Sequence, residues 1–354
     1  MLFLCHGEIC QFNLNILASF IFPGISLHPV WVAAIILLPF IFLLVYAIRL
    51  ARQYFSEEKN KQTIRTVLSH QVAPVVLDKV LLNHNANGLK GSEKDCTFLC
   101  TELNGFSRNG KAMAPDKLVE LVNQFFAEMA AIIQENQGTL DRPDGNILRA
   151  FFGTPLDSQN HAVQACKTAL SMQKAFEVLN EVWKEKNITG LQLRIGICSG
   201  PAVVGLIGAN SNVVYSAMGE SVGLSRKLMN TNKIYGSMIL IGESTYLRTQ
   251  EKVLTRQLDL LRIRESRTPI EIYELIALKD ETLDIKTRET LEYFREGYRL
   301  YRDQNWDWAM NQFRQVLQIN SEDAPARLYL FRCQEFLENP PERGWDGIYS
   351  VKSK

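Results

Sequence analysis

A short stretch near the middle of the chain carries side chains whose types and spacing suit the binding of a cation. Residues 141–153 read DRPDGNILRAFFG. An Asp-Gly pair ahead of a β-prone run indicates a hairpin, because glycine accepts the positive φ that a tight two-residue turn requires. Asp144, Gly145 and Asn146 are therefore expected at the hairpin tip, followed by a strand over 147–152. Carboxylates on such a tip can hold a cation, and an ordinary surface turn is the alternative that the same residues allow.

Strand and helix patterns alternate around this hairpin and predict an α+β sandwich of the ferredoxin-like kind. The apolar run 96–103 is expected to be a buried strand, and 115–134 and 158–185 are expected to be amphipathic helices. The later elements expected along the chain are strands 191–199 and 202–207, a helix 221–230, and strands 238–241 and 270–275. Strand, helix, hairpin, helix, strand is the order of a ferredoxin-like domain with added elements.

Length and composition exclude several classes of protein. The 354 residues are enough for two domains with a large core, and a net charge of +1 gives no reason to expect nucleic acid as a partner. The seven cysteines are scattered without a Cys-x-x-Cys pair, so reduced, mostly buried thiols are favoured over a zinc site or disulfides. The five histidines are equally dispersed, and none is assigned a role as ligand or base.

The N-terminal part of the chain contains a predicted transmembrane helix. Residues 30–48 form an uncharged apolar run close to the ~20 residues that a helix needs to cross a bilayer. Pro39 lies within this run and is tolerated in membrane helices, while Arg49 and Arg52 follow it and place the rest of the chain in the cytoplasm. A second span over 12–27 is left open, and a cleaved signal peptide or a buried core helix fits the sequence less well.

The segment after the membrane helix is expected to be a dimerising helix followed by a linker. Within 51–83, apolar residues recur at roughly helical spacing and predict a juxtamembrane helix that pairs with a partner copy: Ile64, Val67, Leu68, Val72, Val75 and Val76. Residues 84–94 are polar and are taken as a linker. The expected boundaries are therefore 1–50 for the membrane anchor, 51–94 for the helix and linker, 95–278 for the central domain and 279–354 for a C-terminal segment.

Ordered sequence matches along the central domain carry a family resemblance. The first of them are FL at 98–99, GFS at 105–107, LVELVNQFF at 118–126, GTLD at 138–141 and AFFGTP at 150–155. They continue with HA at 161–162, LRIGI at 193–197, GPAVVG at 200–205, IG at 207–208, YG at 235–236 and PIEIYEL at 269–275. With these matches, residues 95–278 resemble the catalytic domain of class III adenylyl and guanylyl cyclases, and the resemblance implies the fold of that family.

The resemblance also implies a reaction. In the family, a ribose 3′-hydroxyl attacks the α-phosphorus of ATP or GTP and displaces pyrophosphate, while two aspartates hold two divalent ions, Mg²⁺ or Mn²⁺. An asparagine and an arginine from the partner subunit stabilise the transition state, and a lysine with an aspartate or threonine reads the purine. The sites therefore form only in a head-to-tail dimer, which here implies a homodimer or a heterodimer with another cyclase.

The positions implied to bind metal are altered in this chain. The two metal aspartates fall on Glu102 and Asn146, so the pair carries one formal negative charge where the family has two. Mg²⁺ requires carboxylate ligands in near-ideal octahedral geometry, so its affinity is expected to fall sharply. Asp144, two residues before Asn146, is left open as a substitute metal ligand.

The other catalytic positions of the family are altered as well. The transition-state asparagine falls on Gly223, which has no side chain, and the arginine falls on Lys227, which lacks the bidentate fork. The purine-reading positions fall on Arg142 and Ser216. Loss of one preorganised donor lowers a rate by roughly 10²–10³. Neither half of the site is therefore expected to be intact.

Two functions remain open. The favoured one is a membrane-anchored pseudo-cyclase that binds a nucleoside triphosphate weakly, if at all, and serves as the regulatory or scaffolding partner in a cyclase dimer. The alternative is an active cyclase with a remodelled metal site built on Glu102, Asp144 and Lys227, which would need Mg²⁺ or, by preference, Mn²⁺. The resemblance to membrane-anchored bacterial cyclases implies the inner (cytoplasmic) membrane, with the cyclase-like domain in the cytoplasm.

The C-terminal segment is expected to be helical and similar to a tetratricopeptide repeat. Gly297, Leu300, Ala309 and Phe313 stand at the relative offsets of such a repeat, and two tryptophans at 306 and 308 are expected to pack around its second helix. A single repeat cannot bury its own apolar face. It is therefore expected to lean on the cyclase-like domain, a second copy or a partner protein, and a plain helical hairpin that stabilises the dimer is the alternative.

Overall fold

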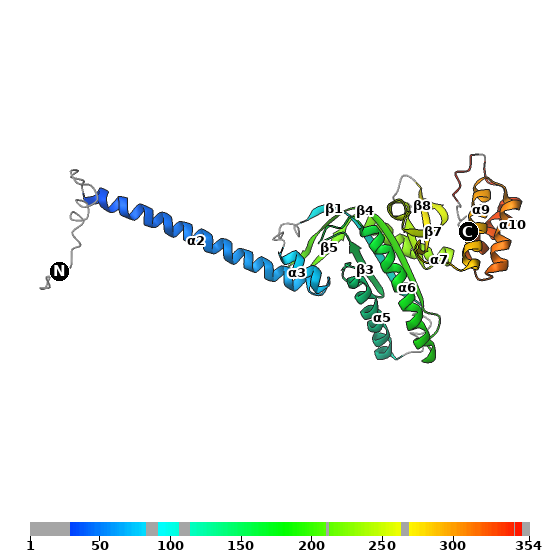
Figure 1. The fold of residues 1–354 in the computed structure, drawn as a ribbon, viewed down its shortest axis with the longest axis horizontal. Helices are drawn as coiled ribbons and strands as arrows, with labels where there is room; N and C mark the ends of the chain where they lie inside the picture. Colours follow the sequence, from blue (N-terminus) through cyan, green and yellow to red (C-terminus); the bar gives the residue numbers. More distant parts are fainter. Residues whose placement is uncertain are drawn as a thin grey trace. The chain divides into compact units, whose positions relative to one another are not determined.

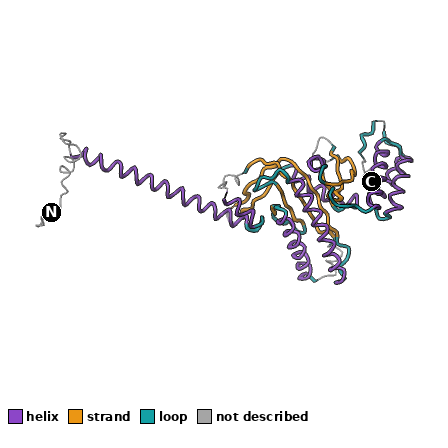
Figure 2. The backbone as a smooth tube through the Cα atoms, viewed as in Figure 1, coloured by secondary structure: helices purple, strands orange, loops and turns teal. Residues whose placement is uncertain are grey.

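The computed structural model describes residues 29–82, 91–105, 114–209, 212–262, 269–342 and 344–348. The open second span at 12–27 lies outside these residues. The chain divides into two units, Met1–Thr63 and Ile64–Lys354. The second unit contains the sheet and every candidate site residue, and it is shown with the first in Figures 1 and 2.

Helix α2, Pro29–Leu68, contains the predicted membrane segment and continues through Pro39. Its part Leu37–Leu68 is long and apolar enough to cross a membrane, and the apolar window is not buried within the protein. The sequence predicted a membrane helix ending near residue 48 and a separate juxtamembrane helix. The structure instead has one helix across both, because no residue with a strong tendency to break helices stands between 48 and 68.

The end of α2 and the short helix α3, Pro74–Leu82, pack on the chain's own sheet. Ile64, Leu68, Val72 and Val76 are buried in one cluster with residues of β1 and β5, whereas Val75 is exposed. The sequence assigned this apolar face to a partner copy, and for the four buried residues that prediction is wrong. The predicted linker 84–94 is also too long, because strand β1 already begins at Ser92.

The described strands form one eight-stranded sheet in the order β2-β3-β1-β4-β6-β8-β7, with β5 paired to β4. Their bounds are Ser92–Asn104 (β1), Thr139–Leu140 (β2), Ile147–Phe152 (β3), Gln192–Ala209 (β4), Asn212–Met218 (β5), Ile239–Gly242 (β6), Val253–Leu261 (β7) and Ile270–Leu278 (β8). All neighbours are antiparallel except β4 and β6. The predicted α+β sandwich is confirmed.

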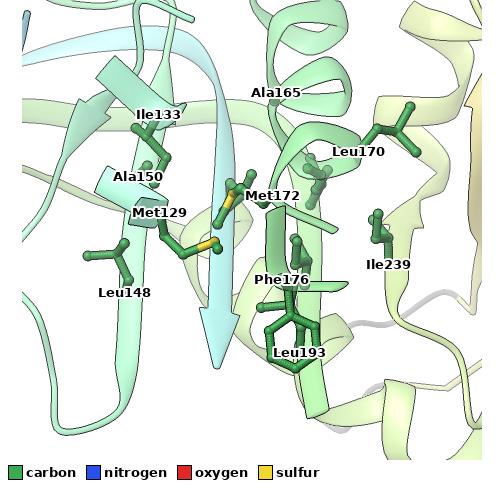
Figure 3. Packing of buried hydrophobic residues seen from close by; sticks show 14 of the residues in the cluster. Met129, Ile133, Leu148, Ala150, Ala165, Leu170, Met172, Phe176, Leu193 and Ile239 are labelled. Carbon is green, nitrogen blue, oxygen red and sulfur yellow. The ribbon is translucent and has the colours of Figure 1, made fainter. Parts of the chain in front are cut away.

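Helices cover both faces of the sheet. Helices α5, Pro115–Glu135, and α6, His161–Glu185, lie side by side on one face (Figure 1). Figure 3 shows this core, in which Met129 and Ile133 of α5 and Met172 and Phe176 of α6 meet Leu148 and Leu193 of the sheet. The opposite face is covered by α7, Glu220–Tyr235. Successive residues of a strand point to opposite faces, so Leu99 enters the first core while Cys100 contacts Met229 of α7.

Two predictions about the sheet need correction. Strands 191–199 and 202–207 are one strand, β4, which continues through Gly200 and Pro201. Proline is tolerated here because β6 pairs only with Ile195–Ile197 and β5 pairs only from Val203, so no second neighbour requires its missing N–H. Strands β5 and β7 and the short helix α8, Glu243–Thr249, were not predicted.

The C-terminal segment forms three helices, α9 (Ile285–Arg302), α10 (Trp306–Ile319) and α11 (Ala324–Glu338). Gly297 lets α9 approach α10, because an added Cβ would lie 2.9 Å from the Phe313 ring. Trp306 is buried among aromatic rings as expected, whereas Trp308 is 67% exposed, which corrects its predicted role. The likeness to a tetratricopeptide repeat stays a prediction.

These helices pack against the cyclase-like sheet, one of the surfaces predicted for them. Their aromatic cluster is continuous with Leu240, Leu258 and Ile272 of the sheet. Two buried ion pairs join α11 and its N-cap to β7: Arg332 lies 2.6 Å from Asp259, and Arg256 lies 2.7 Å from Asp323. The segment is therefore packed as part of the same folded unit.

Candidate functional site

The predicted hairpin exists, and its tip has the expected residues. Asp144 and Ile147 exchange two backbone hydrogen bonds of 3.0 Å around Gly145 and Asn146, and Gly145 has a φ of +63°. A glycine with positive φ at the first central position is typical of tight hairpin turns. Strand β3 pairs with β1 so that Ile147 lies opposite Glu102, which brings the two predicted metal positions together.

Asn146 donates hydrogen bonds at the place where the resemblance expects a metal ligand. Its Nδ2 lies 2.8 Å from the carbonyl oxygen of Leu103 and 3.3 Å from Oε1 of Glu102. A backbone carbonyl can only accept, so the amide nitrogen must face it, and the same nitrogen therefore faces the Glu102 carboxylate. One N–H group of Asn146 thus occupies the side of Glu102 where a cation would otherwise be held.

The other carboxylates of the hairpin already face cationic side chains. Oδ2 of Asp144 lies 3.4 Å from Nη1 of Arg226 on α7, and Oδ2 of the buried Asp141 lies 3.4 Å from Nη2 of Arg149. Cys100 on β1 lies opposite Arg149 of β3, and burial raises the pKa of its thiol to about 12. Cys100 is therefore a neutral neighbour at physiological pH rather than a thiolate ligand.

These residues do not fit a two-metal site. Glu102 accepts from an amide, Asp144 is paired with an arginine, and Asn146 offers a donor. No group of three or more His, Cys, Asp or Glu side chains is placed to hold a metal ion anywhere in the described part of the chain. Asp144 as a substitute ligand stays a prediction, and a metal there would have to compete with Arg226.

The predicted purine-reading positions lie on two segments that one side chain connects. Arg142 is exposed and lies two residues after Leu140, and Ser216 is half-buried on β5 next to Tyr215. Gln71 is buried between them: its Nε2 donates to the carbonyl oxygens of Leu140 and Tyr215, both at 2.8 Å, and its Oε1 accepts from the Tyr215 N–H at 3.1 Å. The loop after α2 thereby ties together the segments that carry Arg142 and Ser216.

The predicted transition-state positions lie on α7. Gly223 and Lys227 are one turn apart on this helix, so they share a face. Gly223 is exposed, and apart from its chain neighbours and the backbone of its own helix, no described atom lies within 4 Å of the position that a Cβ would occupy. The position can accept a side chain, and the chain supplies none.

Sequence reasoning missed three residues that shape this site: Gln71, Arg149 and Arg226. Gln71 ends the polar run Ser69, His70, Gln71, so no local pattern distinguishes it as a residue that will be buried. The two arginines carry no local signal either, because their contacts depend on the register of β3 and the placement of α7.

Comparison with known proteins identifies the domain. Residues 90–277, more than half of the chain, match the adenylate and guanylate cyclase catalytic domain. The chain belongs to this family. Class III cyclases use Mg²⁺ or Mn²⁺, and their catalytic domains function as dimers. The fold and family are therefore those of a nucleotidyl cyclase.

Known relatives of this cyclase domain include enzymes named for either nucleotide. It is 25% identical over 185 residues to Adenylate cyclase 1 of Rhizobium meliloti, covering 52% of this chain and 28% of that protein. It is 26% identical over 198 residues to "Guanylyl cyclase, membrane" of Dictyostelium discoideum, covering 55% and 13%. The crystal structure of the adenylyl cyclase CyaB from P. aeruginosa matches with a TM-score of 0.51 at 26% identity, over 55% of this chain and 100% of that one. The match therefore spans under a third of both sequence relatives.

Replacing Asn146 by aspartate tests the donor role of its amide. We expect Asn146→Asp to lower the free energy of unfolding by about 1–2 kcal/mol in EDTA, because a carboxylate would face the Glu102 carboxylate and the Leu103 carbonyl. Saturating Mn²⁺ should restore the loss, since an ion that binds only the folded state stabilises it. Thermal unfolding with and without Mn²⁺ measures both effects. Asn311→Asp on the exposed face of α10 is the control, and an equal Mn²⁺ response in the unsubstituted protein would contradict the prediction.

Replacing Gln71 tests the tie between the two purine-reading segments. Gln71→Ala should lower the free energy of unfolding by about 2 kcal/mol, because it leaves buried backbone groups of Leu140 and Tyr215 without partners. Gln315→Ala, at an exposed position of α10, should change it by less than about 0.5 kcal/mol. Chemical denaturation of both variants gives the comparison, and equal effects would show that the three bonds contribute nothing.

Proposed function

We propose that this protein is a membrane-anchored class III cyclase homologue without effective catalysis of its own, which acts as the regulatory or scaffolding partner in a cyclase dimer. The anchor would be α2 in a bacterial inner membrane, with the cyclase domain in the cytoplasm. The dimer would contain a second copy or another cyclase. A nucleoside triphosphate would bind weakly, and the C-terminal helices could contact a further protein.

The observation that carries this proposal is the hydrogen bond from Asn146 Nδ2 to Glu102 Oε1. A metal site needs two oxygen ligands that point their lone pairs at one ion. Here Asn146 turns an N–H donor toward the Glu102 carboxylate. The two side chains therefore hydrogen-bond to each other instead of presenting two acceptors to one ion. The Arg226 guanidinium supports the same conclusion, because it forms an ion pair with Asp144, the carboxylate that could replace the missing metal ligand.

The predicted transition-state positions also support a regulatory or scaffolding role, because they would not complete the active site of an intact partner subunit. In a head-to-tail dimer, each site combines the metal positions of one subunit with the transition-state positions of the other. Gly223 offers no donor and Lys227 offers a point charge without a fork, so an intact partner would gain little from this chain. Because the catalytic domains of the family function as dimers, this chain would contribute its fold to the dimer rather than catalytic groups.

Cyclase assays on the purified whole chain in detergent test the proposal. With ATP or GTP and Mn²⁺, the chain alone should give no cyclic nucleotide above background. Mixed with an intact cyclase from the same cell, it should change that enzyme's activity or its oligomeric state. Robust cyclic AMP or cyclic GMP from the chain alone would overturn the proposal in favour of the alternative, an active cyclase with a remodelled site that uses Asp144.

A further inference from the structure

A cavity of about 690 Å³ lies between the cyclase sheet and the first C-terminal helix, away from the nucleotide site. Its size falls within the range of ligand-binding clefts. One wall is formed by residues of β7 and β8, and the other by residues of α9, which contacts β7. Nothing in the cyclase chemistry uses this cavity.

The cavity runs along an open sheet edge. Strand β7 is the last strand of the sheet, and Thr255, Arg256 and Gln257 all line the cavity although neighbouring residues of a strand face opposite sides. Residues of both orientations in one lining are expected where a cavity runs past the edge of a strand. Along an antiparallel edge, alternate residues point their N–H and C=O groups away from the sheet. Among the described residues, no backbone group pairs with this outer edge of β7.

Only part of the edge is open. Tyr329 of α11 donates its hydroxyl to the carbonyl oxygen of Leu258, which closes the edge beyond that residue. The stretch from Leu254 to Gln257 remains beside the cavity. An unpaired edge of this kind can accept an added strand from another chain.

The facing wall of α9 is basic. Arg288, Arg295, Arg299 and Arg302 all line the cavity, and their spacing of seven, four and three residues places them on one face of the helix. The row spans about 21 Å of helix, which is the length of about six residues of extended chain. The acidic residues that line the cavity are fewer: Glu271, Glu292 and Asp303.

Two of these arginines are available to a ligand. Arg299 pairs with Glu296 and Asp303, and Arg302 donates to the Gly347 carbonyl oxygen. Arg288 and Arg295 are exposed, and the side chain of neither makes a hydrogen bond or salt bridge to the described parts of the protein. Since the whole chain has a net charge of only +1, this excess of positive charge is local.

We propose that the groove between β7 and α9 binds an acidic peptide segment of a partner protein, which adds as a strand to β7 and places its carboxylates against Arg288 and Arg295. The chain's own neighbouring segments do not match this chemistry. Residues 263–268 contain two arginines and one glutamate, and residues 349–354 contain two lysines and no acid. An extended acidic segment from another protein satisfies both the strand edge and the arginine wall.

Fluorescence anisotropy with a labelled (Glu-Thr)₄ peptide and the purified whole chain in neutral detergent tests this proposal. We expect saturable binding that weakens as salt rises, and no binding of (Lys-Thr)₄. Arg288→Gln combined with Arg295→Gln should weaken binding by about tenfold or more, because two charge-assisted contacts are lost. Arg314→Gln, at an exposed arginine of α10 outside the cavity, is the matched control and should bind as the unsubstituted protein does.

A backbone-methylated (Glu-Thr)₄ peptide separates strand addition from simple charge attraction, because it lacks the N–H donors that an added strand needs. It should bind at least tenfold more weakly than the unmethylated peptide. Equal binding of both peptides, no effect of the two arginine changes, or no saturable binding of (Glu-Thr)₄ would each overturn the proposal. Pyrophosphate that binds in the groove while the peptide does not would overturn it as well and identify a small-anion site.

Discussion

Restoring four side chains is expected to raise the production of cyclic nucleotide by this cyclase domain. The changes are Glu102→Asp, Asn146→Asp, Gly223→Asn and Lys227→Arg, made together. They return two carboxylates to the hairpin site and two donors to α7, and the space around Gly223 accommodates the new amide. Each preorganised donor contributes roughly 10²–10³ to a rate, and such effects do not simply add. With Mn²⁺ and ATP or GTP, we expect product formation at least about 10²-fold above the unsubstituted chain.

The matched control keeps Asn146 and carries the other three changes. It should stay near background, because the amide would still donate to the carboxylate at position 102. Chromatographic detection of cyclic AMP and cyclic GMP measures both variants. If the fourfold variant folds, dimerises and stays silent, the four positions are not what separates this domain from an active cyclase. If the control is equally active, Asn146 is not the residue that weakens the site.

Removing Arg332 is expected to loosen the C-terminal helices from the cyclase domain. Arg332 and Asp259 are both buried and lie 2.6 Å apart. Arg332→Ala would leave the Asp259 carboxylate in the core with, among the described residues, only the Tyr235 hydroxyl and the Leu260 N–H as donors. Loss of one partner of a buried pair is strongly destabilising, and we expect about 3 kcal/mol less stability in chemical denaturation.

Arg327 provides the comparison on the same helix. It pairs with Glu322 at 2.8 Å, but both side chains are at least half exposed. Surface pairs of this kind contribute about 0–1 kcal/mol, so Arg327→Ala should leave the denaturation midpoint nearly unchanged. Tryptophan fluorescence can follow the transition, since Trp306 and Trp345 lie in the aromatic cluster of this segment. Similar losses for both variants would show that burial does not set the strength of the Arg332 pair.

The elements with strong periodic patterns could be predicted from the sequence. Helix α5 begins at Pro115 as predicted and ends within one residue of the expected position, and the hairpin tip at Gly145 has the positive φ that its Asp-Gly pair indicated. Both depend on local chemistry: proline fits the first turn of a helix, and glycine fits the left-handed region. The cyclase family could be inferred as well, because its matches occur in order along the domain.

The rest depends on tertiary neighbours. Strand β4 passes through Gly200 and Pro201 because β1 pairs with it on one side while the other side is open at that point, which no local rule shows. Strand β7 was missed because its charged residues, Arg256 and Asp259, are buried by pairing with the C-terminal helices. The roles of Asn146 and Arg226 follow from which atoms face each other across β1, β3 and α7.

Gln71 has a consequence for how an input at the N-terminal helix would travel. Its side chain and its carbonyl oxygen both bind Leu140, whose next residue, Asp141, opens the hairpin, and its side chain also binds Tyr215, whose next residue is Ser216. A twist or shift at the end of α2 is therefore separated from Asp141 and from Ser216 by one hydrogen bond of Gln71 and one peptide unit. Such a movement would also reach the hydrophobic cluster in which Ile64 and Leu68 pack with β1 and β5, so the hydrogen bonds of Gln71 and the apolar contacts of α2 would transmit it together.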